Sequence, residues 1–338
     1  MKNYPYPLGC HISVIHDSRE DDRKFLHDTA IVEYNGALIT AWYSCPDKEI
    51  SENTAIVGRK SLDGGKSWQE PFVIVRDDGS EDGIRHFVPL SFLKRDGSLF
   101  AIISKMISHD RPVSVGLYKL INFDTDEWEW VTDVFSESDG LSVIVNGNEG
   151  SETPDGDLVF GGRFARGVGK YPDTPCVITS RGGNILDWTL VPLSDSPVGN
   201  CPETVTTLIG SRLVAFTRNP NGVKAYESLN YGKSWSEKQT NLPTNPVKIF
   251  PFTLTTGKTV VAFNVSGDLL ERSRLCLAEI DDNLLVKKIY TLAVGDFGLG
   301  NIYHYPCVIE SNGKLLVTCT VGAGVRSAVL ISIPIESI

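Results

Sequence analysis

A carboxylate and a guanidinium stand at matching ends of two predicted strands in the middle of the sequence. Glu203 opens the first strand, along which Val205 and Thr207 continue its alternation, and Arg218 closes the second. Residues 209–211 turn the chain between them, so the two charged ends are neighbours in an antiparallel hairpin. A pair of this kind is usually a cross-strand ion pair that adds little stability at a surface. The rest of the chain decides whether this pair also belongs to a ligand-binding or catalytic site.

The hairpin is one of six similar units. Each unit is a strand, a turn with a glycine and a more apolar strand, as in HDTAIVEYNGALITAWYS at residues 27–44 and YHYPCVIESNGKLLVTCT at residues 303–320. The turn glycines recur every 47 to 61 residues, at Gly36, Gly97, Gly156, Gly210, Gly257 and Gly313. Units of about 50 residues are typical of β-propellers, because each blade needs about four strands. We therefore predict an all-β fold, a single six-bladed β-propeller domain over residues 1–338.

In a propeller, the first strands of all blades line the central axis, so equivalent strand ends converge on one opening, which we call the axial mouth. The starts of the first strands supply His27, His86, Asn148, Glu203, Phe250, and Tyr303 or His304. The ends of the second strands supply Trp42, Lys105, Arg163, Arg218, Asn264 and Thr320. This ring is far more polar than the strands between its members, so it predicts a ligand pocket.

The composition excludes several classes of function. The chain has 338 residues, of which 41% are hydrophobic and 22% charged, and this suffices for a large core. Its formal net charge of −10 and pI near 5.1 provide no basic face, so we expect no nucleic-acid partner. The seven cysteines form no CxxC pair and no ligand-like spacing with histidine, and the acids form no calcium-loop pattern. We therefore expect no metal site and no cofactor.

No segment of the sequence predicts secretion or insertion into a membrane. The N-terminal MKNYPYPLGC lacks an apolar core, and no hydrophobic run approaches membrane length. Cys176, Cys276, Cys307 and Cys319 lie in apolar strand-like runs, where a thiol is usually a small buried hydrophobic group. We expect a soluble, reduced, cytoplasmic protein without a membrane partner, or a periplasmic or secreted one if a leader was removed.

Two segments carry a recognisable turn motif. SLDGGKSW at residues 61–68 matches S-x-D-x-G-x-x-W in full, and SLNYGKSW at residues 228–235 has Asn230 at the Asp position. In such a turn between outer strands, Asp63 accepts backbone N–H groups and Trp68 packs back between the strands, so both are expected to be structural. The motif is the Asp-box, and from about residue 27 to residue 320 the chain resembles the sialidase-like six-bladed propellers with BNR/Asp-box repeats.

The resemblance implies a mechanism. Sialidases carry a Glu and an Arg on the first hairpin of the fourth blade, spaced as Glu203 and Arg218 are here, and a Tyr that opens the last blade. An anionic sugar repels a carboxylate nucleophile, whereas a neutral phenol activated by a glutamate avoids that repulsion. Tyr303 is the first candidate for this nucleophile and Tyr305 the second.

Sialidases also hold the substrate carboxylate with three arginines. Arg218 corresponds to the second, and Arg272, in ERSRL, corresponds best to the third, with Arg274 as the alternative. The first belongs to an R-I-P motif that this sequence lacks, and His27 takes its place as a weaker, pH-dependent clamp. The resemblance thus adds Arg272 to the predicted substrate-binding residues His27, His86, Lys105, Arg163, Arg218, Asn264 and His304. Within that set, Arg163 and Lys105 are expected to supply the missing positive charge.

The general acid of a sialidase is an Asp in the loop after the first hairpin. The corresponding loop, SCPDKEISEN, offers Asp47, Glu49 and Glu52, and Asp47 stands for the three because the sequence does not choose among them. The resemblance then implies a retaining exo-glycosidase that acts on a terminal, acidic sugar of a glycan or oligosaccharide. Two alternatives stay open. One is an enzyme of different specificity, either a neutral-sugar glycosidase or a polysaccharide lyase that uses His86 or His304 with Tyr303. The other is a non-catalytic sugar-binding propeller.

Overall fold

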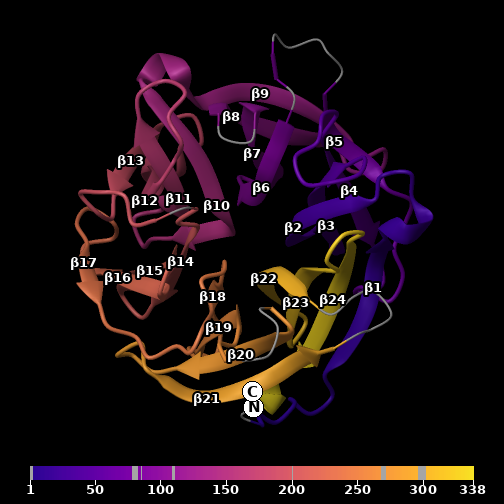
Figure 1. The fold of residues 1–338 in the computed structure, drawn as a ribbon, viewed down its shortest axis with the longest axis vertical. Helices are drawn as coiled ribbons and strands as arrows, with labels where there is room; N and C mark the ends of the chain where they lie inside the picture. Colours follow the sequence, from indigo (N-terminus) through magenta and orange to yellow (C-terminus); the bar gives the residue numbers. More distant parts are fainter. Residues whose placement is uncertain are drawn as a thin grey trace.

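The computed structural model describes residues 3–77, 83–84, 86–108, 111–199, 201–267, 272–295 and 302–338. Within these residues, the strands form six antiparallel sheets of four strands each, arranged around one axis (Figure 1). The predicted all-β, six-bladed β-propeller is therefore confirmed. The first strands of the blades lie closest to the centre in Figure 1, as the sequence pattern predicts.

The blades follow one another along the chain. Blade 1 comprises β2 Phe25–Tyr34, β3 Ala37–Cys45, β4 Ala55–Ser61 and β5 Phe72–Arg76. Blade 2 comprises β6 His86–Arg95, β7 Ser98–Ser108, β8 Arg111–Asn122 and β9 Glu127–Ser136. Blade 3 comprises β10 Leu141–Glu152, β11 Leu158–Arg166, β12 Thr174–Ser180 and β13 Trp188–Pro192. Blade 4 comprises β14 Thr204–Ile209, β15 Arg212–Asn219, β16 Gly222–Ser228 and β17 Ser236–Lys238. Blade 5 comprises β18 Phe250–Thr253, β19 Thr259–Asn264, β20 Arg274–Ile280 and β21 Val286–Val294.

Blade 6 combines both ends of the chain. Its inner strands are β22 Tyr303–Ser311, β23 Lys314–Val321 and β24 Ser327–Pro334, and its outermost strand is β1 His11–Asp17. β1 pairs antiparallel with β24, with His11 opposite Ser332 and Asp17 opposite Ser327. The two termini consequently lie together in Figure 1, and hydrogen bonds between the first and last strands close the ring.

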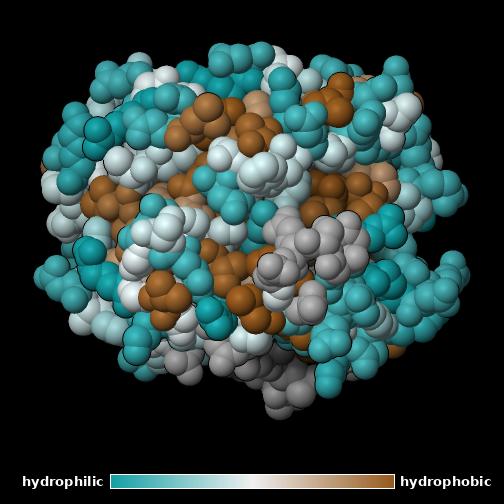
Figure 2. Space-filling view, turned by 90° about the horizontal axis from the view of Figure 1, so that it is seen from above, coloured by the Kyte–Doolittle hydropathy of each residue, from teal (hydrophilic) through white to brown (hydrophobic). Residues whose placement is uncertain are grey.

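The sequence of each blade explains its local structure. The turn between β2 and β3 is Asn35-Gly36, with φ of 50° and 76°, the left-handed conformation that a two-residue hairpin turn needs. Every residue of β3 is buried, and so is every residue of β19, as expected for middle strands covered by blades on both sides. The hydrophobic core therefore lies between neighbouring blades; one cluster, for example, joins blades 1 and 2. Figure 2 views the rim of the disc. The surface there is mainly hydrophilic, with hydrophobic patches separated by polar residues.

The first Asp-box lies on the outside of blade 1, between β4 and β5. Asp63 Oδ1 accepts the backbone N–H groups of Lys66 and Ser67 at 3.0 and 2.9 Å, and its Oδ2 accepts the hydroxyl of Ser67 at 2.6 Å. The Ser67 bonds, with help from Ser61, hold the pKa of Asp63 well below its usual value. Trp68 packs against a hydrophobic cluster that includes the buried residues of blade 6. The expected structural role of this turn is confirmed.

The second Asp-box is built in the same way, between β16 and β17. Asn230 Oδ1 accepts the backbone N–H of Ser234 and the hydroxyl of Ser228, both at 2.9 Å. Trp235 Nε1 donates to the carbonyl of Gly232 at 3.0 Å. An amide thus replaces the carboxylate without changing the turn, so the motif does not depend on a negative charge.

Candidate active site at the axial mouth

Two first strands contain a β-bulge directly after a buried histidine. The pairing register shifts after His27 in β2 and after His304 in β22. The next residue in each case has a positive φ, 55° for Asp28 and 51° for Tyr305, which non-glycine residues seldom adopt. A bulge re-aims a side chain out of the strand's alternation. Here both bulges bring the residue after the histidine to a cavity at the axial mouth.

This mouth cavity has a volume of about 80 Å³, several times the space that one water molecule needs. Its walls come from blades 1, 2, 3, 4 and 6. They are formed by His27, Asp28, Tyr43, Glu49, Ile50, Val88, Pro89, Met106, Ile144, Asn146, Arg163, Cys201, Glu203 and Tyr305. Of the ring of strand-end residues predicted from the sequence, His27, Arg163 and Glu203 line this cavity.

Tyr305, Glu203 and Arg218 form a connected group in this cavity. Tyr305 Oη donates to Glu203 Oε1 at 2.7 Å, and Arg218 Nη1 donates to Glu203 Oε2 at 3.1 Å. Arg218 Nη1 also lies 3.4 Å from Tyr305 Oη. Burial raises the pKa of Tyr305 well above its usual value, and the charge of Glu203 raises it further. The phenol therefore keeps its proton at neutral pH and points it at a carboxylate, the arrangement of a nucleophile beside its base.

Tyr303, the first nucleophile candidate, lies elsewhere. Its side chain is 0% exposed, and its hydroxyl donates to the carbonyl of Gly295 at 2.8 Å. In a regular strand, residues two apart share one face, so the sequence alone could not separate Tyr303 from Tyr305. The bulge after His304 breaks that alternation, so Tyr305, and not Tyr303, lines the mouth cavity.

A buried ion pair that the sequence did not reveal flanks this group. Lys248 Nζ lies 2.5 Å from Asp28 Oδ1 and 5.2 Å from the ring centroid of Tyr305. Burial raises the pKa of Asp28, and the ammonium of Lys248 opposes that rise. Asp28 could have been found by reading HD at residues 27–28 and HY at residues 304–305 as the same position of the repeat. Lys248 lies in the segment before β18, outside the repeat, and no sequence signal marks it.

Histidines 27 and 304 form walls of the site in their neutral state. The ring of His27 packs edge-on against Tyr305 at a centroid distance of 4.3 Å, and burial, with Arg326 next, lowers its pKa well below the usual value. Burial lowers the pKa of His304 to about 3, and Arg326 and Arg272 add to this effect. Burial beside these cations disfavours the charged form of His27 that a carboxylate clamp would need.

Two of the predicted arginines besides Arg218 reach the mouth. The guanidinium of Arg272 lies 5.5 Å from the ring centroid of Tyr305, and its Nη1 donates to His304 Nδ1 at 2.6 Å. Arg272, and not the alternative Arg274, is thus the residue beside the phenol. Arg163 lines the mouth cavity and donates to Tyr171 Oη at 2.9 Å.

Three predicted binding residues face other parts of the fold. Lys105 Nζ lies 3.3 Å from Asp133 Oδ1 and 5.4 Å from the ring centroid of Trp130, both on the outer strand β9. The Nδ2 of Asn264, which is 0% exposed, donates to the carbonyls of Arg274 and Tyr303 at 3.2 Å each. His86 Nδ1 lies 3.2 Å from Thr54 Oγ1. Successive side chains of a strand point to opposite faces, so some residues at strand ends face the neighbouring strands instead of the mouth.

Among the three acids after the first hairpin, Glu49 lines the mouth cavity. It accepts a hydrogen bond from Tyr43 Oη at 3.1 Å. Asp47, the candidate named from the sequence, is exposed, and its Oδ1 accepts the backbone N–H of Lys48 at 2.9 Å. Glu49 and Glu52 are exposed as well. Of these three acids, Glu49 is the one that lines the mouth cavity.

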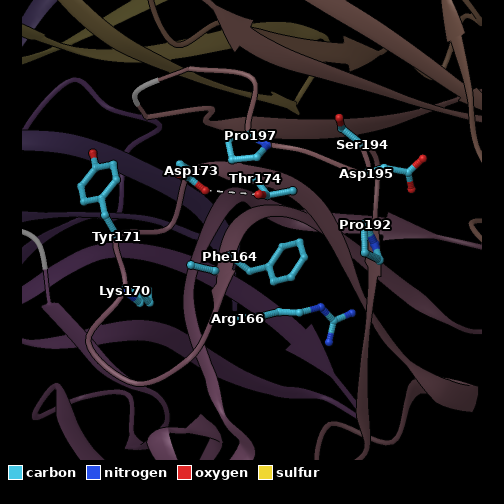
Figure 3. Close-up of a pocket in the computed structure, with 11 residues that line it drawn as sticks. Phe164, Arg166, Lys170, Tyr171, Asp173, Thr174, Pro192, Ser194, Asp195 and Pro197 are labelled. Atoms are coloured by element: carbon cyan, nitrogen blue, oxygen red, sulfur yellow. Dashed lines mark hydrogen bonds between the residues drawn. The ribbon is translucent and has the colours of Figure 1, made fainter.

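A second, larger cavity of about 480 Å³ lies beside blade 3 (Figure 3). Tyr171 connects the two, because it lines the larger cavity while its hydroxyl contacts Arg163 and, at 2.6 Å, Cys201 Sγ, both in the mouth wall. Polar groups from several segments surround the larger cavity in Figure 3, including Asp173, which accepts a hydrogen bond from Thr174 at 3.2 Å. Tyr171 thus stands between the two cavities.

Two further observations hold for the part of the chain that the structure describes. No group of three or more His, Cys, Asp and Glu side chains there is arranged to hold a metal ion. None of the described helices has the length and hydrophobicity that crossing a membrane requires.

Comparison with known proteins places these features in a family. The sequence matches the model of the BNR repeat-like domain over residues 36–317. No curated protein matches the chain. Several solved structures share the fold at low sequence identity, and sialidases are among them.

Three sialidases illustrate this likeness. The Trypanosoma rangeli sialidase in complex with 2,3-difluorosialic acid has 15% identity and a TM-score of 0.74, and the match covers 97% of this chain and 60% of that one. The Hadza microbial sialidase Hz136 has 14% identity and a TM-score of 0.74, with 97% and 69% covered. The NanB sialidase from Streptococcus pneumoniae has 11% identity and a TM-score of 0.69, with 97% and 71% covered. The chain thus spans about 60% of the length of the Trypanosoma rangeli enzyme. At these identities the likeness concerns the fold, whereas the family match covers most of the chain: the protein belongs to the BNR repeat-like domain family.

Proposed function

We propose that the protein is a glycoside hydrolase of sialidase type, a retaining exo-glycosidase that acts on a terminal, acidic sugar. The observation that carries this proposal is the 2.7 Å hydrogen bond from Tyr305 Oη to Glu203 inside the mouth cavity. A buried phenol that donates to a carboxylate is a nucleophile with its base in place. The Trypanosoma rangeli sialidase, which has the same fold, is described as a covalent intermediate with 2,3-difluorosialic acid.

The reaction proceeds in two steps. In the first, Tyr305 Oη attacks the anomeric carbon while its proton passes to Glu203. The bond to the leaving oxygen breaks, and that oxygen takes a proton from the carboxylic acid of Glu49. In the second step, Glu49 removes a proton from water, which attacks the anomeric carbon of the tyrosyl glycoside. Tyr305 then recovers its proton from Glu203, and two inversions at one carbon give net retention.

The charges around the mouth favour an anionic sugar. Lys248 and Arg272 lie 5.2 and 5.5 Å from the ring centroid of Tyr305, and Arg163 lines the same cavity, in a chain whose formal net charge is −10. Cations in a low-dielectric cavity attract an anion strongly, and a neutral phenol can approach it without repulsion. The larger cavity beside Tyr171 is the proposed place for the rest of the glycan, because Tyr171 lines it and contacts Arg163 of the mouth wall.

Turnover of a panel of activated aryl glycosides, with acidic and neutral sugars, tests the proposal. We expect the wild type to prefer an acidic sugar, and Tyr305→Phe or Glu203→Gln to remove most of the rate. The double variant should lose little more than either single variant, since both residues serve one proton transfer. Tyr303→Phe is the matched control, because it removes a hydroxyl that is bonded to Gly295 instead of Glu203, and it should stay active.

Two outcomes would contradict the proposal. Full activity of Tyr305→Phe, or additive losses in the double variant, would remove the tyrosine mechanism and return the site to an enzyme of other specificity. Tight binding of sugars by a wild type that hydrolyses no member of the panel would leave a sugar-binding propeller.

A further inference from the structure

Asn146 carries a buried amide in the wall of the mouth cavity. It lies in β10 of blade 3, lines the cavity and is only 2% exposed. Its Oδ1 is enclosed and accepts no hydrogen bond from the described residues, and its Nδ2 donates to none of them. A buried amide without partners destabilises a fold, because nothing offsets the loss of its contacts with water. This amide therefore indicates a hydrogen-bonding partner that is not part of the chain.

A second asparagine of the same strand shows how a structural amide looks in this protein. Asn148 Oδ1 accepts the backbone N–H of Phe92 at 3.1 Å, and its Nδ2 donates to the carbonyl of Ile31 at 2.5 Å. These two bonds connect blade 3 with blades 2 and 1. Both ends of one amide are thus bonded within the fold, whereas both ends of the other, two residues earlier, are left to the cavity.

A β-bulge fixes the position of Asn146. The pairing register between β10 and β11 shifts directly after Asn146, which lies opposite Gly161, and the next residue, Gly147, has a φ of 95°. The same irregularity follows His27 and His304 in blades 1 and 6. Bulges re-aim side chains and are frequent beside active sites. Asn146 therefore belongs to the same construction that brings the other functional groups to the mouth.

Apolar side chains accompany Asn146 in the cavity wall. Blade 2 contributes Val88, Pro89 and Met106, and Ile144 precedes Asn146 by two residues on the same strand. In such surroundings a hydrogen bond is stronger than in water, and a ligand that leaves the amide unpaired binds poorly. An uncharged amide placed there distinguishes ligands by their hydrogen-bonding groups.

We propose that Asn146 is a specificity-determining residue of the mouth, which binds two neighbouring hydroxyl groups of the ligand sugar. A primary amide offers an acceptor and two donors, so one hydroxyl donates to Oδ1 while its neighbour accepts from Nδ2. The identity of the sugar rests on the proposed function, whereas the contact itself rests on the unbonded amide. A sugar that lacks one of these hydroxyls leaves part of the amide unpaired and binds more weakly.

The stability of the ligand-free protein provides the first test. Leucine has nearly the shape of asparagine but no polar atoms, so Asn146→Leu should melt about 2 °C or more above the wild type. Asn148→Leu is the matched comparison, and it should melt lower, because it leaves the N–H of Phe92 and the carbonyl of Ile31 unpaired. A lower melting temperature for Asn146→Leu would show that the amide is already satisfied without a ligand, and it would overturn the proposal.

Sugar binding provides the second test, without relying on turnover. Calorimetry compares N-acetylneuraminic acid and glucuronic acid with their monodeoxy analogues, in the wild type and in Asn146→Leu. For one of the acids, removing one hydroxyl should weaken binding to the wild type about ten-fold and binding to Asn146→Leu less than about two-fold, since only the wild type loses a contact. Equal losses in both proteins for every analogue, or no binding of either acid by the wild type, would refute the contact.

The two proposals fail in different ways. If Tyr305→Phe still turns over substrate while the effect of the missing hydroxyl depends on Asn146, the tyrosine mechanism fails and the contact stands. If Tyr305→Phe is inactive while every deoxy analogue affects both proteins equally, the mechanism stands and the contact fails.

Discussion

Two carboxylates of this protein sit in opposite kinds of surroundings. Asp63, in the outer turn of blade 1, is bonded by Ser61, Lys66 and Ser67, all within four residues of it. Glu203, at the axial mouth, is bonded by Arg218, 15 residues away, and by Tyr305, 102 residues away. The outer turn depends only on residues close in sequence, and blade 4 forms the same turn with an asparagine. The mouth forms only when several blades are in place, because its polar groups form hydrogen bonds between residues far apart in the sequence.

The largest expected difference between the two carboxylates is in their effect on the catalytic rate. Replacing a carboxylate by its amide at either place removes the charge at nearly constant shape. Glu203→Gln should lower kcat/KM by about 10³-fold, the size expected for loss of a general base. Asp63→Asn should leave it unchanged, because Asn230 serves the same turn in blade 4. Steady-state kinetics of both variants on one aryl glycoside measures the contrast, and comparable losses would mean that the outer turn reaches the active site.

For stability we expect the opposite: a change in the outer turn should destabilise the fold without lowering the rate. Trp68→Ala should lower the free energy of unfolding by about 3 kcal/mol, because it removes a large side chain from the cluster between blades 1 and 6. Its kcat/KM should match the wild type at a temperature where both are folded. Urea unfolding gives the first quantity, and Trp235→Ala provides a second test in blade 4. A wild-type unfolding midpoint for Trp68→Ala would show that the Asp-box tryptophan does not stabilise the propeller.

Acid should affect the two regions in different pH ranges. His304 has a pKa near 3 in the folded protein, below its unfolded value of about 6.5. The unfolded chain therefore binds its proton first, so this residue makes stability fall as pH drops from about 6.5 towards 3. The loss should be about 2 kcal/mol at pH 5. Asp63, whose pKa is also lowered, loses its contribution only below the normal range of an aspartate.

Unfolding of His304→Gln and Asp63→Asn at pH 7, 6 and 5 separates these effects. The difference in unfolding free energy between wild type and His304→Gln should shrink as pH falls, whereas for Asp63→Asn it should stay constant over this range. Parallel curves for wild type and His304→Gln would mean that His304 is not held neutral in the folded state.

The smallest expected effect is that of salt on binding. Raising NaCl from about 50 mM to about 500 mM should weaken the binding of a sugar acid several-fold, because the cations of the mouth are partly screened. The neutral analogue should bind equally at both concentrations. Titration calorimetry at the two concentrations measures this, and equal weakening of both ligands would exclude charge as the basis of recognition.

The repeat in the sequence was sufficient to predict the fold, since hairpins with a glycine turn recur in all six blades. It also paired Glu203 with Arg218, because hairpin geometry depends only on local alternation. It could not choose Tyr305 over Tyr303, because a β-bulge leaves no mark in the order of residue types. Lys248 was missed for a different reason. It lies in a connecting segment, and only the packing of one blade on the next brings it beside Tyr305 and Asp28.

The closure of blade 6 has a consequence for how the protein folds. β1 precedes the other described strands and its partner β24 follows them, so the ring stays open until β24 has been synthesised. The contact between His27 and Thr320 joins residues 293 positions apart, and such distant contacts make folding slow. Until β1 docks on it, β24 presents an unpaired edge, to which another chain can add. Deleting residues 1–17 would leave that edge permanently exposed, and we expect the shortened protein to self-associate and to lose the mouth where the first and last blades meet.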